Sequence, residues 1–253
     1  MHYSWDEDYT RGYEWWMLQE AKKRNPDIKL YALPWGFPGW LRDDNDLPWK
    51  NIPTTADYIV KWINGAKVHY NLTIDYIGVW NESPYNITYI KTLRKALDIA
   101  GLSETLIIGG DEFGWVIADQ IAKDTELSDA IYAIGAHYPE MNSTSSARNC
   151  GKPIWASEET VWGRNLAETI NQNYVSGLMT STIVWSTITS YYYGLEDYGS
   201  GLMKAVEPWS GNYLVELSIW LTAHTTQFTE IGWKYFKHGY GVGNFTNGGS
   251  YVV

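Results

Sequence analysis

Short apolar segments typical of β-strands alternate with amphipathic segments typical of α-helices along most of this chain. Six strands are predicted, at residues 28–33, 74–80, 106–109, 130–136, 154–156 and 181–185. Helices are predicted at residues 9–24, 54–70, 85–100, 115–127 and 167–178, with Thr54 or Thr55 as the N-cap of the second. Parallel neighbouring strands need a connection long enough to hold a helix, so this alternation predicts an α/β fold with a parallel sheet.

Two architectures fit a parallel sheet of this kind, an open doubly wound sheet and an eight-stranded (β/α)8 TIM barrel. Polar and aromatic residues gather just past the predicted strands, where barrel enzymes carry their catalytic groups. The clearest examples are Pro34-Trp35-Gly36, Asn81-Glu82, Asp111-Glu112, His137-Tyr138 and Ser157-Glu158-Glu159. No glycine-rich phosphate loop follows the early strands, which weakens the nucleotide-binding alternative. The sequence therefore favours the barrel.

The pattern changes near the C-terminal end of the chain. A last helix is predicted from Gly211 to Thr226, and from Ile231 onward the segments are short, aromatic and punctuated by glycine. Asn247-Gly248-Gly249 has the composition of a hairpin turn. We predict a barrel domain over residues 1–229 and the beginning of a β-sandwich over residues 230–253.

Charge and composition exclude several classes of partner. The net charge of −10 makes a nucleic-acid or anionic-lipid surface improbable. No apolar run approaches the roughly 20 residues that a membrane span needs. The five histidines are scattered and Cys150 is the single cysteine, so neither a zinc site nor an internal disulfide is expected. The 15 Trp and 20 Tyr, whose flat faces suit sugar rings, tilt the interpretation towards a carbohydrate ligand.

Two glutamates that follow different predicted strands suit hydrolysis of a glycosidic bond. Glu82 follows the strand at 74–80, and Glu158 follows the strand at 154–156. Two carboxyl groups about 5 Å apart allow one to attack the anomeric carbon while the other transfers the proton, which is the retaining mechanism. Glu159 competes with Glu158, because one step along a strand reverses the direction of the side chain. The sequence pattern leaves this choice open.

Five separated motifs resemble the galactocerebrosidase (galactosylceramidase) family, which are retaining lysosomal glycoside hydrolases that remove galactose from galactosylceramide. In chain order the motifs are Ile77-Gly78-Val79-Trp80-Asn81-Glu82, Ile134-Gly135-Ala136-His137-Tyr138-Pro139, Trp155-Ala156-Ser157-Glu158-Glu159, Glu207-Pro208-Trp209-Ser210-Gly211 and Ala223-His224-Thr225-Thr226-Gln227-Phe228. The resemblance covers essentially the whole chain. It implies that the six predicted strands correspond to the third to eighth strands of a TIM barrel.

The same resemblance implies roles for individual residues. Glu82 maps to the acid/base and Glu158 to the nucleophile. The implied substrate-binding residues are Trp35, Asn81, His137, Trp185 and Tyr198, with Asn81 at the sugar 2-hydroxyl. From the residues alone, a structural role for His137 is as plausible as a role in the site, and a helix N-cap is the favoured role for Asp111. No cofactor and no metal are expected.

The resemblance also sets expectations about the cell biology. The family implies a lysosomal location and a saposin-type protein that presents the lipid. Glycosylation is predicted at the Asn-x-Ser/Thr sites of Asn71, Asn86, Asn142 and Asn244, which fits a secretory route. The alternatives are a non-catalytic glycan-binding or glycolipid-binding isoform and a retaining glycosidase for another sugar. We expect a chain with six barrel strands to leave two open sheet edges, and so to be poorly stable and inactive by itself.

Overall fold

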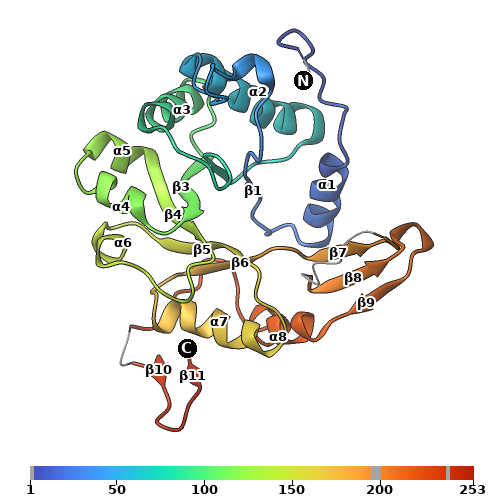
Figure 1. The fold of residues 1–253 in the computed structure, drawn as a ribbon, viewed down its shortest axis with the longest axis vertical. Coiled ribbons are helices and arrows are strands. Elements are labelled where there is room, and N and C mark those ends of the chain that lie inside the picture. Colours follow the sequence, from blue (N-terminus) through green and yellow to red (C-terminus); the bar gives the residue numbers. More distant parts are fainter. Residues whose placement is uncertain (1–2, 195–200, 238–239) are drawn as a thin grey trace. The chain divides into compact units, whose positions relative to one another are not determined.

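The computed structural model describes residues 3–194, 201–237 and 240–253 (Figure 1). The chain divides into two compact units, Met1–Ile134 and Gly135–Val253. Six strands are hydrogen-bonded in chain order, namely β1 (Tyr31–Ala32), β2 (Tyr76–Gly78), β3 (Leu106–Phe113), β4 (Ile131–His137), β5 (Ile154–Glu159) and β6 (Ser181–Val184). The pairs β1–β2, β2–β3 and β5–β6 are parallel. The predicted parallel α/β sheet is therefore confirmed, with all six strands at their predicted places.

The helices of the first unit follow the predicted alternation, with shifted ends. They are α1 (Glu14–Arg24), α2 (Ile52–Tyr70), α3 (Ile87–Ile99), α4 (Val116–Ile121) and α5 (Thr125–Ala130), with the 3-10 turn η1 (Gly39–Leu41). The side chain of Asn51 caps α2 by accepting a hydrogen bond from the Thr54 amide at 3.1 Å, so the predicted cap at Thr54 or Thr55 is wrong. The predicted helix 115–127 is two helices, because Asp124 caps a new one through the Leu127 amide.

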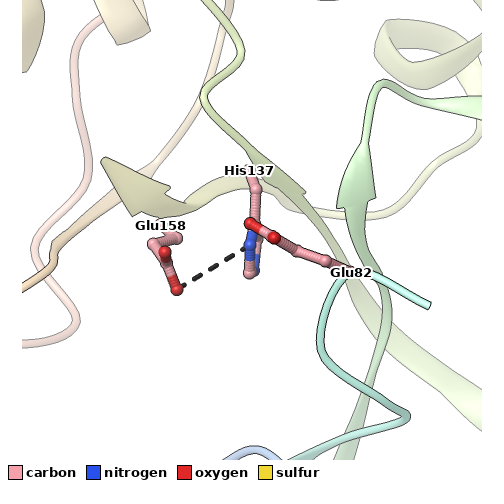
Figure 2. A group of neighbouring side chains, drawn as sticks. All are labelled: Glu82, His137 and Glu158. Carbon is pink, nitrogen blue, oxygen red and sulfur yellow. Dashed lines mark ion pairs between the residues drawn. The ribbon is translucent and has the colours of Figure 1, made fainter. Parts of the chain in front are cut away.

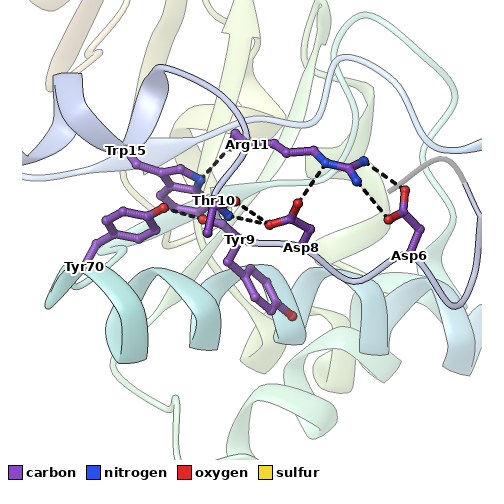
Figure 3. Close-up of polar contacts among 7 residues, drawn as sticks. All are labelled: Asp6, Asp8, Tyr9, Thr10, Arg11, Trp15 and Tyr70. Carbon is purple, nitrogen blue, oxygen red and sulfur yellow. Dashed lines mark hydrogen bonds and ion pairs between the residues drawn. The ribbon is translucent and has the colours of Figure 1, made fainter.

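The segment before α1 is held against α2 by side chains from both (Figure 3). The Tyr70 hydroxyl donates to the carbonyl of Tyr9, and the Trp15 ring stacks on Tyr70 at 4.9 Å between centroids. Gly65 of α2 is needed at this contact, because a Cβ there would lie 2.3 Å from the Tyr9 ring. Arg11 pairs with Asp6 at 2.9 Å and folds the start of the segment back on itself.

Much of the aromatic content of the first unit is structural. The Trp80 ring, which is 9% exposed, meets Phe37 and Trp49 edge-on at 5.9 Å between centroids. Trp49 in turn contacts the fully buried Tyr89 of α3 at 4.9 Å. Edge-to-face pairs of this kind stabilise a core beyond the apolar area that they bury. These rings pack together just before Asn81 and Glu82 in the chain, so part of the aromatic content belongs to the core.

The second unit contains a small sheet that the strand pattern did not predict. Its strands are β7 (Ile188–Tyr191), β8 (Met203–Val206) and β9 (Tyr213–Val215), with β7–β8 parallel and β8–β9 antiparallel. The unit also holds α6 (Ser145–Asn149), α7 (Arg164–Val175), α8 (Leu217–Thr226) and the 3-10 turn η2 (Pro208–Ser210). The last predicted helix therefore begins six residues later than expected, after β9.

The predicted hairpin near the end of the described chain is confirmed. The strands β10 (Gly243–Asn244) and β11 (Ser250–Tyr251) pair antiparallel around Asn247-Gly248-Gly249. Gln172 of α7 donates to the side chain of Asn244 at 2.6 Å, which attaches the hairpin to α7 (Figure 1). The β-sandwich that we predict for residues 230–253 stays a prediction, as does the boundary at residue 229. Among the described helices, none is long and apolar enough to cross a membrane.

Candidate active site

In the first unit, Glu82 lies just past the carboxyl end of β2 and is held by its backbone. Its amide donates to the carbonyl of Asp111 at 2.8 Å, and the amide of Asn81 donates to Pro34 at 2.9 Å. Pro34 follows β1 and Asp111 belongs to β3, so the end of β2 is hydrogen-bonded on both sides. The side chain of Glu82 is exposed and that of Asn81 is half-buried. A carboxyl group so placed is rigid at its backbone and open to a ligand.

The predicted N-cap role of Asp111 is wrong. Asp111 is fully buried inside β3, and the residue at the N-cap of α4 is Trp115. One carboxylate oxygen of Asp111 accepts a hydrogen bond from the Tyr31 hydroxyl of β1 at 2.6 Å. The prediction failed because β3 continues four residues beyond its apolar stretch, to Phe113, and carries Asp111 with it. A buried carboxyl group needs such partners, since burial without them is costly.

In the second unit, β5 has a bulge at the two adjacent glutamates. Ala156 is paired with Thr182 of β6, whereas Glu159 is paired with Val184, so β5 carries one more residue than β6 between these pairs. An extra residue of this kind re-aims the side chains around it. Glu158 and Glu159 are both buried, at 7% and 2% exposed, but they meet different partners.

Glu158 is held by two consecutive residues at the end of β4. The Tyr138 hydroxyl donates to Oε1 of Glu158, and the Tyr138 amide donates to the Glu158 carbonyl at 2.9 Å. Nδ1 of the buried His137 lies 3.7 Å from Oε2 of Glu158, an ion-pair distance rather than a hydrogen bond (Figure 2). The structure thus brings the predicted residues His137 and Glu158 together. Tyr138, which belongs to the same motif, had been given no role.

Glu159 is directed at helix α7 instead. Its Oε1 atom accepts a 3.4 Å hydrogen bond from Nδ2 of Asn173, and that amide also donates to Thr182 of β6 at 2.9 Å. Burial raises the pKa of Glu159 above its ordinary value, and the hydrogen bond from Asn173 opposes this only in part. Glu159 therefore belongs to the packing between β5, β6 and α7.

Replacing Glu159 with Gln should stabilise the protein at neutral pH and have no effect in acid. Because its pKa is raised from 4.5 in the folded state, the unfolded state loses the proton first as the pH rises. Stability is therefore greatest below pH 4.5 and falls as the pH climbs from there to the raised pKa. Glu159→Gln removes this loss, so we expect a melting temperature higher by about 2–4 °C at pH 7.5. Glu168→Gln, on the exposed side of α7, is the control. A Glu159→Gln effect that is equal at pH 4 and pH 7.5 would contradict the prediction.

The predicted substrate-binding tryptophans follow strands and are accessible. Trp35 comes after β1 and is 60% exposed, and Trp185 comes directly after β6 and is 42% exposed. The amide of Trp185 donates to the carbonyl of Glu159 at 2.9 Å. The predicted Tyr198 lies outside the described residues. Exposed rings at strand ends suit stacking on a sugar, in contrast to the buried rings of the core.

The predicted glycosylation sites lie at accessible positions. Asn71, Asn142 and Asn244 are exposed, and Asn86 is half-buried at the N-cap of α3. The side chain of Asn86 caps the helix by accepting from the Tyr89 amide at 3.0 Å. This hydrogen bond uses the side-chain oxygen of Asn86. A glycan would be attached to the side-chain nitrogen, which takes no part in this bond. Whether these sites carry glycans stays a prediction.

The comparisons with known proteins give the family. The model named Glycosyl hydrolase family 59 matches residues 1–227. The chain belongs to this family. It is 51% identical to galactocerebrosidase of Macaca mulatta and 50% identical to galactocerebrosidase of Homo sapiens, in each case over 100% of this chain and 37% of the relative. Galactocerebrosidase of Danio rerio is 48% identical, over 100% of this chain and 39% of the relative. This family 59 chain thus spans less than two fifths of these relatives.

A solved structure supports the fold of the family 59 chain. The glycoside hydrolase family 30 subfamily 8 xylanase Xyn30A from Clostridium acetobutylicum matches with a TM-score of 0.70. The match covers 92% of this chain and 64% of the xylanase at 19% sequence identity. At that identity the likeness concerns the fold alone. Together with the six strands in chain order, it confirms the predicted incomplete (β/α)8 barrel.

Proposed function

We propose that the protein is a retaining β-galactosidase that hydrolyses galactosylceramide and related galactosphingolipids. The observation that carries the proposal is the identity of about 50% to galactocerebrosidases along the whole chain. Glu158 attacks the anomeric carbon and forms a galactosyl ester, and Glu82 donates a proton to the departing oxygen. Water, deprotonated by Glu82, then releases galactose.

The surroundings of the two adjacent glutamates support Glu158 as the nucleophile. The Tyr138 hydroxyl fixes one carboxylate oxygen of Glu158, and His137 lies beside the other. A nucleophile benefits from such orientation, because correct placement of the attacking atom lowers the barrier. Glu159 is instead engaged by Asn173 of α7.

The position of Glu82 supports its role as the acid/base. It follows β2, and Glu158 ends β5, in a sheet whose order is β1 to β6. Catalytic residues of barrel enzymes come from the ends of different strands at the carboxyl face. We propose that the two carboxyl groups work about 5 Å apart, the separation that retention requires.

The sugar pocket is also part of the proposal. Trp35 and Trp185 stack on the galactose ring, and Asn81 donates to the 2-hydroxyl. His137 and Tyr198 are the other proposed substrate-binding residues. The exposure of both tryptophans supports this arrangement. By likeness to the family we further propose a lysosomal location and a saposin-type protein that presents the lipid. The accessible sequons support passage through the secretory route.

The test of the function is the stereochemistry and sugar preference of hydrolysis. The longest natural protein that contains this chain is incubated with dinitrophenyl β-galactoside, β-glucoside and β-xyloside, and the first sugar product is followed by proton NMR. We expect galactose, appearing first as the β-anomer. The α-anomer as the first product, before mutarotation, would refute retention. Preference for another sugar would refute the galactosidase assignment, and binding of galactosylceramide without turnover of any glycoside would favour a glycolipid-binding protein.

A further inference from the structure

A hydrogen bond joins two strands of the first unit that are not neighbours in the sheet. The Tyr31 hydroxyl of β1 donates to Oδ2 of Asp111 of β3 at 2.6 Å. Strand β2 lies between β1 and β3 in the sheet order. The bond therefore crosses over β2 at Gly78. Gly78 precedes Glu82 by four residues.

Gly78 is the residue that makes room for this crossing. A Cβ at position 78 would lie 2.6 Å from Oδ2 of Asp111 and 2.8 Å from the Tyr31 hydroxyl oxygen. It would also lie 2.4 Å from the side chain of Leu33. Both hydrogen-bonded groups thus rest directly on the Gly78 backbone. The glycine is required here for close approach rather than for its backbone angles.

Asp111 connects this bond to Glu82. The Asp111 carbonyl accepts the Glu82 amide at 2.8 Å. Asp111 and Glu82 both have left-handed backbones, with φ of 59° and 47°. Non-glycine residues keep that conformation only when their surroundings hold them there, and such strain is common at functional sites. The Asp111 side chain is fully buried, and its bond to Tyr31 is part-buried.

We propose that Tyr31 and Asp111 are positioning residues that fix the backbone of Glu82 and so aim its carboxyl group at the departing oxygen. The inference rests on the proposed function, in which Glu82 is the acid/base. Neither residue is assigned a contact with the substrate. Loss of the Tyr31 hydroxyl removes this hydrogen bond to the Asp111 side chain, and Asp111 then holds the Glu82 amide less firmly.

The choice of leaving group separates a positioning role from general structural damage. An alkyl alcohol leaves a glycoside only when it is protonated, whereas dinitrophenolate leaves without a proton. General acid catalysis is worth about 10²–10⁴-fold and requires the acid to be within hydrogen-bond reach. A misplaced Glu82 therefore slows the alkyl substrate more than the dinitrophenyl substrate. A smaller fraction of folded protein slows both equally.

The first measurement compares kcat/KM for an alkyl β-galactoside and for dinitrophenyl β-galactoside in the longest natural protein that contains this chain. Tyr31→Phe removes the hydroxyl and keeps the ring. We expect the ratio of alkyl to dinitrophenyl kcat/KM to fall by about 10-fold, a fraction of the full contribution of the acid. Tyr132→Phe, an exposed tyrosine of β4, is the matched control and should leave the ratio unchanged. An unchanged ratio in Tyr31→Phe would overturn the proposal.

The second measurement does not depend on activity. Hydrogen exchange of the Glu82 amide reports its bond to the Asp111 carbonyl, and we expect Tyr31→Phe to speed this exchange by about 10-fold or more. Equal exchange in Tyr31→Phe and in the unmodified protein would overturn the positioning pair. If the unmodified protein hydrolyses no β-galactoside, the proposed function fails, and the exchange rate still decides whether Tyr31 and Asp111 hold Glu82.

Discussion

Glu158→Gln should lower kcat for dinitrophenyl β-galactoside by at least ~10³-fold, a loss expected when a nucleophile is removed. An amide cannot attack the anomeric carbon, so no galactosyl ester forms. Gln has nearly the volume of Glu and can still accept the hydrogen bond from Tyr138, so the fold should be retained. The measurements are kcat and the melting temperature of the same preparation. The melting temperature shows that the loss is chemical rather than structural.

Glu159→Gln is the matched control for this prediction, because it makes the same change one residue away. It should retain activity within a few-fold, since Glu159 contacts Asn173 of α7. Trapping with a 2-fluoro-galactoside gives an independent readout and should label Glu158. A labelled Glu159, or a loss of activity in Glu159→Gln as large as that in Glu158→Gln, would exchange the two assignments.

The choice between these glutamates shows what the sequence could not supply. Alternation along a strand says that neighbours point to opposite faces, but not which neighbour faces the substrate. Here the two side chains have different surroundings at a bulge in β5, which is defined by the pairing of Ala156 with Thr182 and of Glu159 with Val184. This register is set by pairing with β6, and no residue within β5 indicates it.

The fold was predictable where local patterns and tertiary structure agree. The strands that carry Ile77, Ile107 and Ile134 are apolar because both faces of a parallel sheet are covered, and each was predicted at its place. Helix starts were less predictable, because several neighbouring polar residues can act as caps. Asn51 rather than Thr54 or Thr55 caps α2 for that reason.

The sheet of β7, β8 and β9 was missed because its strands have no alternating apolar face. The residues of β9 are all exposed, and those of β7 alternate only between exposed and half-buried. Pairing there depends on contacts such as Ile188 with Met203, which lie far apart in sequence. Asp111 was misassigned for a related reason. Its partner Tyr31 is 80 residues away, and a carboxyl group after an apolar run is more often a helix cap.

Two carboxyl groups of the first unit are candidates for the proton donor, Glu82 and Glu112. Glu112 is half-buried at the end of β3, and burial raises its pKa, a property common among catalytic acids. The nearby Tyr85 has its own pKa raised by burial and by the charge of Glu112. A raised pKa alone therefore favours Glu112, whereas the family motif favours Glu82.

Glu82→Ala should separate the two by the dependence of the rate on the leaving group. Without the acid, kcat/KM for an alkyl β-galactoside should fall by about 10²–10⁴-fold, the usual contribution of general acid catalysis. Dinitrophenyl β-galactoside needs no proton to react, so its kcat/KM should fall far less. Its kcat should still drop, because Glu82 also activates the water that cleaves the galactosyl ester.

Azide tests the second half of this argument, because it attacks the galactosyl ester without a general base. Azide should raise kcat of Glu82→Ala on the dinitrophenyl substrate and give β-galactosyl azide, the product of two inversions at the anomeric carbon. Glu112→Ala should show neither the leaving-group dependence nor the response to azide. If Glu112→Ala shows both and Glu82→Ala shows neither, the proton donor is Glu112. The proposed line from Tyr31 through Asp111 to Glu82 would then have no catalytic acid at its end.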